Sequence, residues 1–265
     1  VEIEDATIDY TDQAAAVKYA LTKLNLKTGR IAPGVPTGVE LSVHAQSNKP
    51  KLDLQTALKT RLTFDPGRSL MLDDLSLDAR GAAADITNLA LKAKGSAKAD
   101  LAGGGFTASK LNVAVTGMSG KNALDIRIDV PRLELTAERA SGDKVSVVAK
   151  ITGPDGMTQV TLALPGVEGT GQAFRSAAAG LDLEMKRGDL AITAKLASPI
   201  TGNIKAQQIA LPQLKASISA SGPNLPGKSI AGELTGSAAV DGVKRSAQAS
   251  LAGKVADSNI KAQVG

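Results

Sequence analysis

The sequence predicts an all-β protein built as one long, twisted and curled antiparallel sheet. Three observations lead to this prediction. Apolar and polar residues alternate with period two along most of the chain, as in strands with one face in water. Turn-forming residues interrupt the alternation at short intervals. No helix is available to cover an apolar face. We expect about 16 to 20 strands, most of them paired with their neighbours in sequence.

The alternation is clearest in segments where every second residue is apolar. Each such strand would turn one face toward an apolar interior and the other toward water. The segments are Leu52 to Phe64, Leu89-Leu91-Ala93, Leu111-Val113-Val115, Leu124-Ile126-Ile128, Val145-Val147-Ala149-Ile151, Val160-Leu162-Leu164, Leu181-Leu183-Met185, Leu190-Ile192-Ala194-Leu196 and Leu214-Ala216-Ile218-Ala220.

Turns are predicted where proline, glycine and aspartate cluster between these segments. The clusters are Asp65-Pro66-Gly67, Ser141-Gly142-Asp143, Gly153-Pro154-Asp155-Gly156, Pro165-Gly166 and Asp241-Gly242. One stretch has two interpretations. Thr11-Asp12-Gln13 could cap a helix carrying Val17, Leu21 and Leu24, but the same residues form a strand with Val17, Tyr19 and Leu21 on one face. We favour the strand.

The alternation changes phase by one residue at three places: 72–75, 86–89 and 209–214. A phase change turns the alternate face over, so the strand must bulge or turn a corner there. These places share a loosely repeated Leu-x-x-Leu-x-Leu pattern, whose spacing is too irregular for a strict solenoid.

Composition narrows the architecture and the function. The chain of 265 residues has three Phe, two Tyr and no Trp, so its apolar interior would be thin and aliphatic. Without helices, that interior could lie between two packed sheets or along one sheet curled into a trough that something else fills. No composition shift or linker divides residues 1–265, so we expect one continuous section.

Several classes of site are excluded. The chain has no cysteine, so thiol chemistry and cysteine metal sites are absent. Its net charge is +5, but 31 basic residues are scattered among 26 acidic ones and few aromatic rings could stack bases. We therefore expect no nucleic-acid binding.

The segment GPNLPGKS, residues 222–229, has the spacing of a phosphate-binding loop. Pro223 and Pro226 have no N–H group to donate to a phosphate, and Gly232 and Gly236 follow where a helix should begin. We interpret the segment as a hairpin connection and expect no nucleotide binding.

Catalytic and metal sites are also not expected. His44 is the only histidine and alternation places it on a polar face, with no nucleophile-elbow pattern in the chain. Asp73 and Asp74 are adjacent strand residues, which point to opposite faces and cannot easily share an ion. Gly103-Gly104-Gly105 is interpreted as a flexible turn. We predict a protein that is not an enzyme and needs no cofactor.

Several sequence segments resemble those of the AsmA family, which are bacterial proteins with an inner-membrane anchor and a long periplasmic β-rich region. The segments are VEIEDATIDYTDQ, KLNLKTGRIAPGVPTGVELSV, LMLDDLSLDARG, DITNLALKAKG and IALPQLKASISASGPNLPG. The part TGRIAPGVPTGVELSV of the second segment is the most specific. Because the chain has no stretch of 18 consecutive apolar residues, the resemblance implies a periplasmic section of a longer protein whose membrane anchor lies outside it.

The resemblance also implies a function. AsmA-like proteins are related to repeating β-groove proteins and are associated with phospholipid movement and outer-membrane integrity. We therefore expect an aliphatic groove that guides phospholipid acyl chains. The alternative is a scaffold or assembly factor for outer-membrane proteins, acting through sheet edges. The expected groove-lining residues are Leu89, Leu91, Leu111, Val113, Val115, Leu124, Ile126, Ile128, Val145, Val147, Val160, Leu162, Leu181, Leu183, Met185, Leu190 and Ile192.

Overall fold

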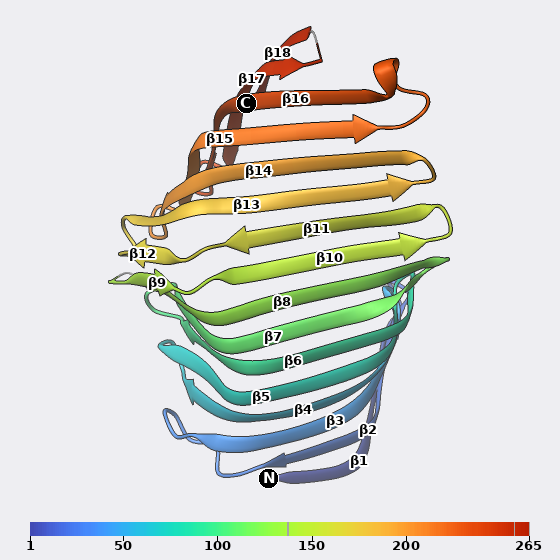
Figure 1. Ribbon diagram of the computed structural model, residues 1–265. Helices are drawn as coiled ribbons and strands as arrows, with labels where there is room; N and C mark the ends of the chain where they lie inside the picture. Colours follow the sequence, from blue (N-terminus) through green and yellow to red (C-terminus); the bar gives the residue numbers. More distant parts are fainter. Residues whose placement is uncertain (137, 257, 265) are drawn as a thin grey trace.

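A computed structural model describes residues 1–136, 138–256 and 258–264, and it places 18 strands in one antiparallel sheet (Figure 1). The all-β prediction and the expected number of strands are therefore confirmed. The strands are β1 (Glu2–Asp12), β2 (Val17–Thr28), β3 (Thr37–Asn48), β4 (Lys51–Asp65), β5 (Ser69–Ala83), β6 (Ile86–Asp100), β7 (Gly105–Ser119), β8 (Asn122–Leu135), β9 (Ala140–Gly142), β10 (Val145–Gly153), β11 (Gly156–Leu164), β12 (Val167–Gly169), β13 (Phe174–Arg187), β14 (Leu190–Asn203), β15 (Gln208–Ser221), β16 (Ser229–Asp241), β17 (Ser246–Val255) and β18 (Ser258–Val264).

The strands follow one another as a simple meander. Long strands pair with their neighbours in sequence, from β1 at one edge to β18 at the other. The short strands β9 and β12 pair with each other and continue the lines of β10 and β11, so β8 pairs with both β9 and β10. The sheet therefore has sixteen strand positions side by side. Two of these positions are each divided between two strands, one between β9 and β10 and the other between β11 and β12.

Two local predictions are settled by these boundaries. The stretch from Thr11 to Leu24 is a hairpin: β1 ends at Asp12 and β2 begins at Val17, so the strand interpretation holds from Val17 onward and the helix is wrong. The predicted turn at Ser141-Gly142-Asp143 is wrong for its first two residues, which belong to β9. The chain leaves the strand only at Asp143 and Lys144, where the sheet bends.

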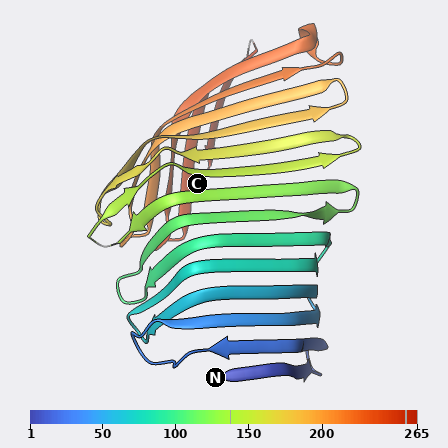
Figure 2. The same cartoon turned by 60° about the horizontal axis from the view of Figure 1, so that its bottom comes forward.

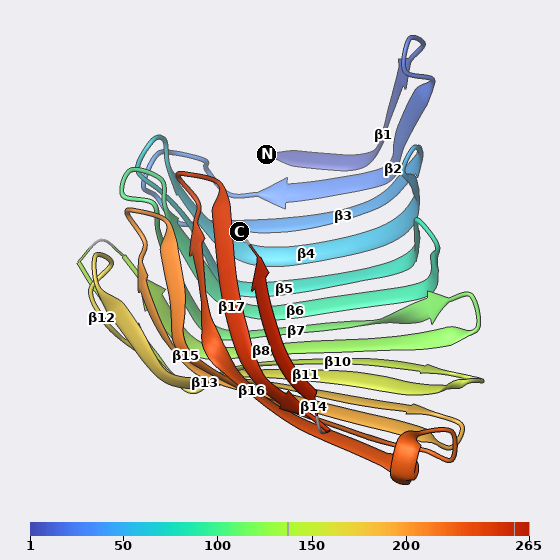
Figure 3. The ribbon, with the colours of Figure 1, turned by 90° about the horizontal axis from the view of Figure 1, so that it is seen from above.

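The sheet curls because irregularities in neighbouring strands line up across it. Figures 2 and 3 show each long strand bending partway along its length, so that the stack of strands forms a trough. Register shifts and interruptions occur at this bend in one strand after another. We call this line the crease; it passes through Asp5, Lys23, Thr60, Asp74, Gly95, Lys110, Pro131, 143–144, Pro165-Gly166, 177–178, Pro199 and Pro212. Proline suits these places because it has no N–H for a strand ladder and is found at bulges.

The Leu-x-x-Leu-x-Leu pattern is the sequence form of a bulge. The residue before the second leucine has a left-handed backbone in several copies, with φ near +51° at Lys23, Asp74 and Asn88 and +50° at Lys110. This conformation adds one residue to the strand, so leucines three apart emerge on the same face. All three predicted phase changes coincide with register shifts between paired strands.

Buried residues show which face lies inside the curl. Apart from glycines, every buried residue that the structure describes lies on one face of the sheet by cross-strand pairing, and many lie beside the crease, such as Ala108 at 1% exposure and Ser176 at 3%. Side chains converge on the inside of a bend and diverge on its outside. We call the face that carries these residues the inner face. Hydroxyl groups on this face also donate hydrogen bonds to backbone carbonyls at the crease. Thr60 Oγ1 donates to the Asp73 carbonyl at 2.9 Å, and Ser198 Oγ donates to the Pro199 carbonyl at 2.8 Å.

Candidate functional site

The inner face carries an unbroken row of cross-strand partners through all sixteen long strand positions. Directly opposite residues in an antiparallel pair lie on the same face, so the row can be followed from strand to strand. Only a glycine in β17 interrupts its aliphatic side chains. The row is Ile3, Leu26, Leu41, Leu58, Leu77, Ala93, Val113, Ile128, Val147, Leu162, Leu181, Leu196, Ala216, Leu234, Gly253 and Ile260. With strands about 4.8 Å apart, it is on the order of 70 Å long.

All the predicted groove-lining residues lie on this inner face. They occupy β6, β7, β8, β10, β11, β13 and β14 as cross-strand partners; for example, Val115 faces Ile126, and Met185 faces Ile192. Contact of these positions with lipid stays a prediction.

The predicted lining set missed the first five strands and the last four. Ile3, Leu26 and Leu41 in β1 to β3 belong to the same row, as do Leu234 in β16 and Ile260 in β18. The sequence contains the necessary signal, because these strands alternate too. Bulges obscure it by shifting the phase, as at Lys23 between Leu21 and Leu26.

The inner face is open to solvent across the part of the chain that the structure describes. The sheet is a single layer, and large apolar side chains remain exposed on its inner face: Leu162 at 40%, Ile151 at 46% and Ile209 at 49%. A sealed sandwich would bury such residues below a few per cent. Of the two architectures that the sequence left open, the structure has the curled single sheet.

The opposite face, which we call the outer face, is polar and partly charged. Glu2, Lys27, Glu40 and Lys59 are successive cross-strand partners in β1 to β4, so charges alternate along this ladder. Lys59 Nζ lies 2.6 Å from Glu40 Oε1, and its hydrogen bond and charge lower the pKa of Glu40 below its usual 4.5. The sheet is therefore amphipathic across its thickness.

His44 lies on this outer face, as predicted. Its Nε2 is 2.6 Å from Asp53 Oδ1, and this hydrogen bond, followed by one from Gln46, lowers the pKa of Asp53 below its usual 3.8. The Asp53 side chain is more than half exposed, so the pair is a solvated contact between β3 and β4.

Asp73 and Asp74 belong to the crease. Asp74 is the bulged residue of β5, and its carboxylate bonds Arg61 Nη2 at 2.9 Å. Among the described residues, no three His, Asp or Glu side chains gather as metal ligands would. Gly103 and Gly104 form a turn between β6 and β7, whereas Gly105 begins β7.

The segment GPNLPGKS connects two antiparallel strands. Ser221 at the end of β15 pairs with Ser229 at the start of β16, and the residues between contain one short 3₁₀ turn, η1 (Pro226–Lys228). The chain leaves the segment as strand β16, so no helix N-terminus faces the loop. The hairpin interpretation is confirmed.

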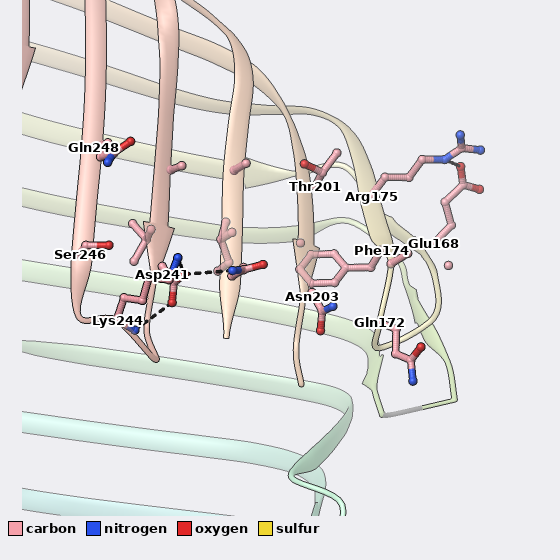
Figure 4. Close-up of a pocket in the computed structure, with 18 residues that line it drawn as sticks. Glu168, Gln172, Phe174, Arg175, Thr201, Asn203, Asp241, Lys244, Ser246 and Gln248 are labelled. Carbon is pink, nitrogen blue, oxygen red and sulfur yellow. Dashed lines mark hydrogen bonds and ion pairs between the residues drawn. The ribbon is translucent and has the colours of Figure 1, made fainter. Parts of the chain in front are cut away.

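A hollow with a volume of about 960 Å³ lies at the ends of β12 to β17 (Figure 4). Most of its lining side chains are outer-face partners, such as Asn203, Gln208, Asp241 and Ser246. Its charged groups are already matched within the protein. The matched contacts are Arg175 Nε to Glu168 Oε1 at 2.8 Å, Gln208 Nε2 to Asp241 Oδ2 at 3.0 Å, and Lys244 Nζ to Asp241 Oδ2 at 3.8 Å.

Hydrogen bonding is the chemistry that this hollow offers. Phe174 also lines it, but its ring is directed toward Gly202 on the inner face, so closely that no other side chain would fit at residue 202. The hollow thus presents amide and hydroxyl groups, while the long aliphatic surface lies on the other side of the sheet.

Comparison with known proteins finds no matching protein family, curated protein or solved structure. Nothing in the part of the chain that the structure describes forms a helix long and apolar enough to cross a membrane.

Proposed function

We propose that this protein is a non-enzymatic lipid-handling module, which holds or guides phospholipid acyl chains along its inner face. The observation that carries this proposal is the continuous row from Ile3 to Ile260, aliphatic at every strand position but one and uncovered by any second layer of described residues. A face of this kind matches an acyl chain, because each methylene removed from water contributes about 0.8 kcal/mol.

The shape and composition of the face favour a flexible chain over a rigid ligand. Its central row consists of Leu, Val, Ile and Ala with one Gly, so it offers little directional recognition. A row on the order of 70 Å long exceeds one acyl chain several times over. Several lipids could then occupy it in succession, as movement along a surface requires.

The cellular setting is proposed from the sequence alone. From the segments that resemble the AsmA family, we propose a periplasmic location, within a protein anchored in the inner membrane and active in envelope biogenesis. The open aliphatic trough is compatible with that assignment. Phospholipid is the proposed partner.

A matched pair of substitutions tests the proposal. Val147 lies in the inner row and its neighbour Val148 lies on the outer face opposite Arg127, and both are half-buried. Val147→Asp places a carboxylate in the path of the acyl chains, yet in an open trough the charge can still reach water, so the fold should survive. We expect photo-crosslinking of a diazirine-labelled phospholipid to the strands around residue 147 to be lost in Val147→Asp and kept in Val148→Asp.

Ile126→Asp on β8 provides a second inner-face site, in case one position proves essential for folding. Circular dichroism confirms the fold of each variant, and native mass spectrometry of the unmodified protein looks for co-purified phospholipid. Equal crosslinking of Val147→Asp and Val148→Asp would contradict the proposal. So would the absence of both crosslinks and co-purified lipid in the unmodified protein.

A further inference from the structure

The two rims of the trough, where strands are joined, differ in their exposed apolar residues. We call one the loop rim; it consists of the connections β2–β3, β4–β5, β6–β7, β8–β9, β12–β13, β14–β15 and β16–β17, on the left in Figure 1 where β9 and β12 lie. The turn rim consists of the connections at the opposite strand ends. Apart from the terminal Val1, the described large apolar residues that are exposed away from the inner face are Ile31, Val35, Leu101 and Val243. All four lie on the loop rim.

These side chains project strongly into solvent, with exposures of 61% for Ile31, 51% for Leu101 and 67% for Val243. Together with Val35, these residues lie in three separate connections: β2–β3, β6–β7 and β16–β17. Such spacing does not make the contiguous apolar patch that a protein interface needs. It suits a fluid layer in which each side chain can insert on its own.

Phenylalanine gathers at the same rim. The chain has three, and all lie on the inner face next to the loop rim: Phe64 is the penultimate residue of β4, Phe106 the second of β7 and Phe174 the first of β13. The aliphatic inner face is thus bordered by aromatic rings where it meets this rim.

Three of the four exposed apolar loop residues also have a cation beside them. Arg30 precedes Ile31, Arg245 follows Val243 by two residues, and the carbonyl of Arg68 accepts the Leu101 N–H at 2.8 Å. Among the ion pairs between described residues, none involves these three arginines.

Two of the nearby acids accept hydrogen bonds within the loops. Asp100 Oδ1 accepts the N–H groups of Ala102 and Gly103, and Asp241 accepts the N–H of Lys244. Over the seven loop-rim connections, six cations outnumber the acids: Arg30, Arg68, Arg139, Lys205, Lys244 and Arg245 stand against Glu138 and the flanking Asp65, Asp100 and Asp241, so this rim carries net positive charge.

The loop rim is also the straighter of the two. Figure 3 looks along the stack of strands: the loops of this rim gather in one column at the upper left, whereas the turns of the other rim spread around the right side and the bottom. A straight rim can lie along a flat surface.

From these features we infer that the loop rim is a membrane-contacting edge, which rests on an anionic phospholipid bilayer with its apolar loop residues inserted and its arginines among the headgroups. The inner face, bordered by Phe64 and Phe106, would then open toward the bilayer. This inference does not depend on acyl chains entering the inner face.

Vesicle flotation with charge-reversed variants tests the inference. The loop-rim triple Arg30→Glu, Arg68→Glu, Arg245→Glu is compared with the turn-rim triple Lys49→Glu, Lys121→Glu, Lys228→Glu, which changes net charge equally. With vesicles of phosphatidylglycerol and phosphatidylcholine, we expect the loop-rim triple to bind at least about tenfold more weakly than the unmodified chain, since each cation near an anionic surface favours binding severalfold. The turn-rim triple should lose much less.

Insertion is measured directly with single tryptophans, because the chain has none. Leu101→Trp should shift its fluorescence to the blue and be quenched by brominated acyl chains, whereas Ala15→Trp in the β1–β2 turn should not. Equal weakening by the two triples, equal quenching at both tryptophans, or no binding of the unmodified protein to anionic vesicles would each overturn the inference. Val147→Asp should bind vesicles normally, which separates this result from the proposed lipid path.

Discussion

Single residues at the crease adopt a backbone conformation that L-amino acids rarely tolerate. Lys110 in β7 has φ +50°, and the Asn112 side-chain amide donates to its carbonyl at 3.2 Å. The same arrangement recurs at Lys23 and Asn25, where the distance is 3.0 Å. Left-handed backbone costs a non-glycine residue about 1 kcal/mol, so these lysines are strained by the bulges they form.

At the residue scale we predict that Lys110→Gly raises the stability of the sheet by about 1 kcal/mol, since glycine adopts this conformation without strain. Lys195→Gly is the matched control, because Lys195 lies exposed in a regular part of β14. The control should instead lose about 0.5 to 1 kcal/mol, because glycine weakens an ordinary strand. Urea unfolding of both variants measures the difference, and a loss of stability in Lys110→Gly would contradict the argument.

At the scale of one strand, a bulge decides which face a leucine occupies. In β5, Asp74 is the added residue between Leu72 and Leu75, and both leucines lie on the inner face because of it. Deleting Asp74 would remove this added residue, so Leu72 and Leu75 would be two apart and stay on the inner face by plain alternation, whereas deleting Ser76 from the regular part of β5 would turn the segment from Ser69 to Leu75 over.

We therefore expect the Ser76 deletion to lower the urea midpoint strongly and to increase binding of an apolar dye, and the Asp74 deletion to lower the midpoint much less. Asp74→Gly, which keeps the residue count and the left-handed backbone, should unfold near the midpoint of the unmodified protein. An equally strong loss in the Asp74 and Ser76 deletions would show that Asp74 is not an added residue and that the bulge does not control the register.

The edge strand β1 bears on the alternative role as a scaffold. It carries Glu2, Glu4, Asp5, Asp9 and Asp12, and it bulges at Asp5 with φ +46°. Charged side chains and bulges are the features by which sheet edges resist pairing with another chain. At this edge, the structure gives no support to recruitment by strand addition.

At the scale of the whole molecule, contacts run only between neighbouring strands. Long strands contact the strands beside them in the meander, and no second layer ties distant parts of the described chain together. Stability in such an array is approximately a sum of local terms, as in repeat proteins.

We therefore predict that a chain ending at Asn203, after β14, folds without β15 to β18. Its circular dichroism per residue should match that of the full chain, and its unfolding midpoint should change little, because the remaining strands keep their neighbours. An unfolded fragment would show that the sheet depends on long-range closure.

The sequence by itself determined the strands, the two chemically different faces and the positions of three of the bulges. Alternation in β8 around Ile126 and Ile128, and the phase change at Asp74, depend on the steric preferences of a few adjacent residues, so they are visible in a single strand. The same local rules identified GPNLPGKS as a connection between strands.

Only the tertiary structure decided that these faces join into one row from Ile3 to Ile260 and that this row stays uncovered. Alternation shows which face of a strand is apolar, but not what lies against it. That depends on the register between strands and on the sum of the bends along the crease, and both arise from pairing between segments rather than from any one segment. The bends add up to a trough (Figure 3), and for this reason the aliphatic surface faces solvent instead of a second sheet.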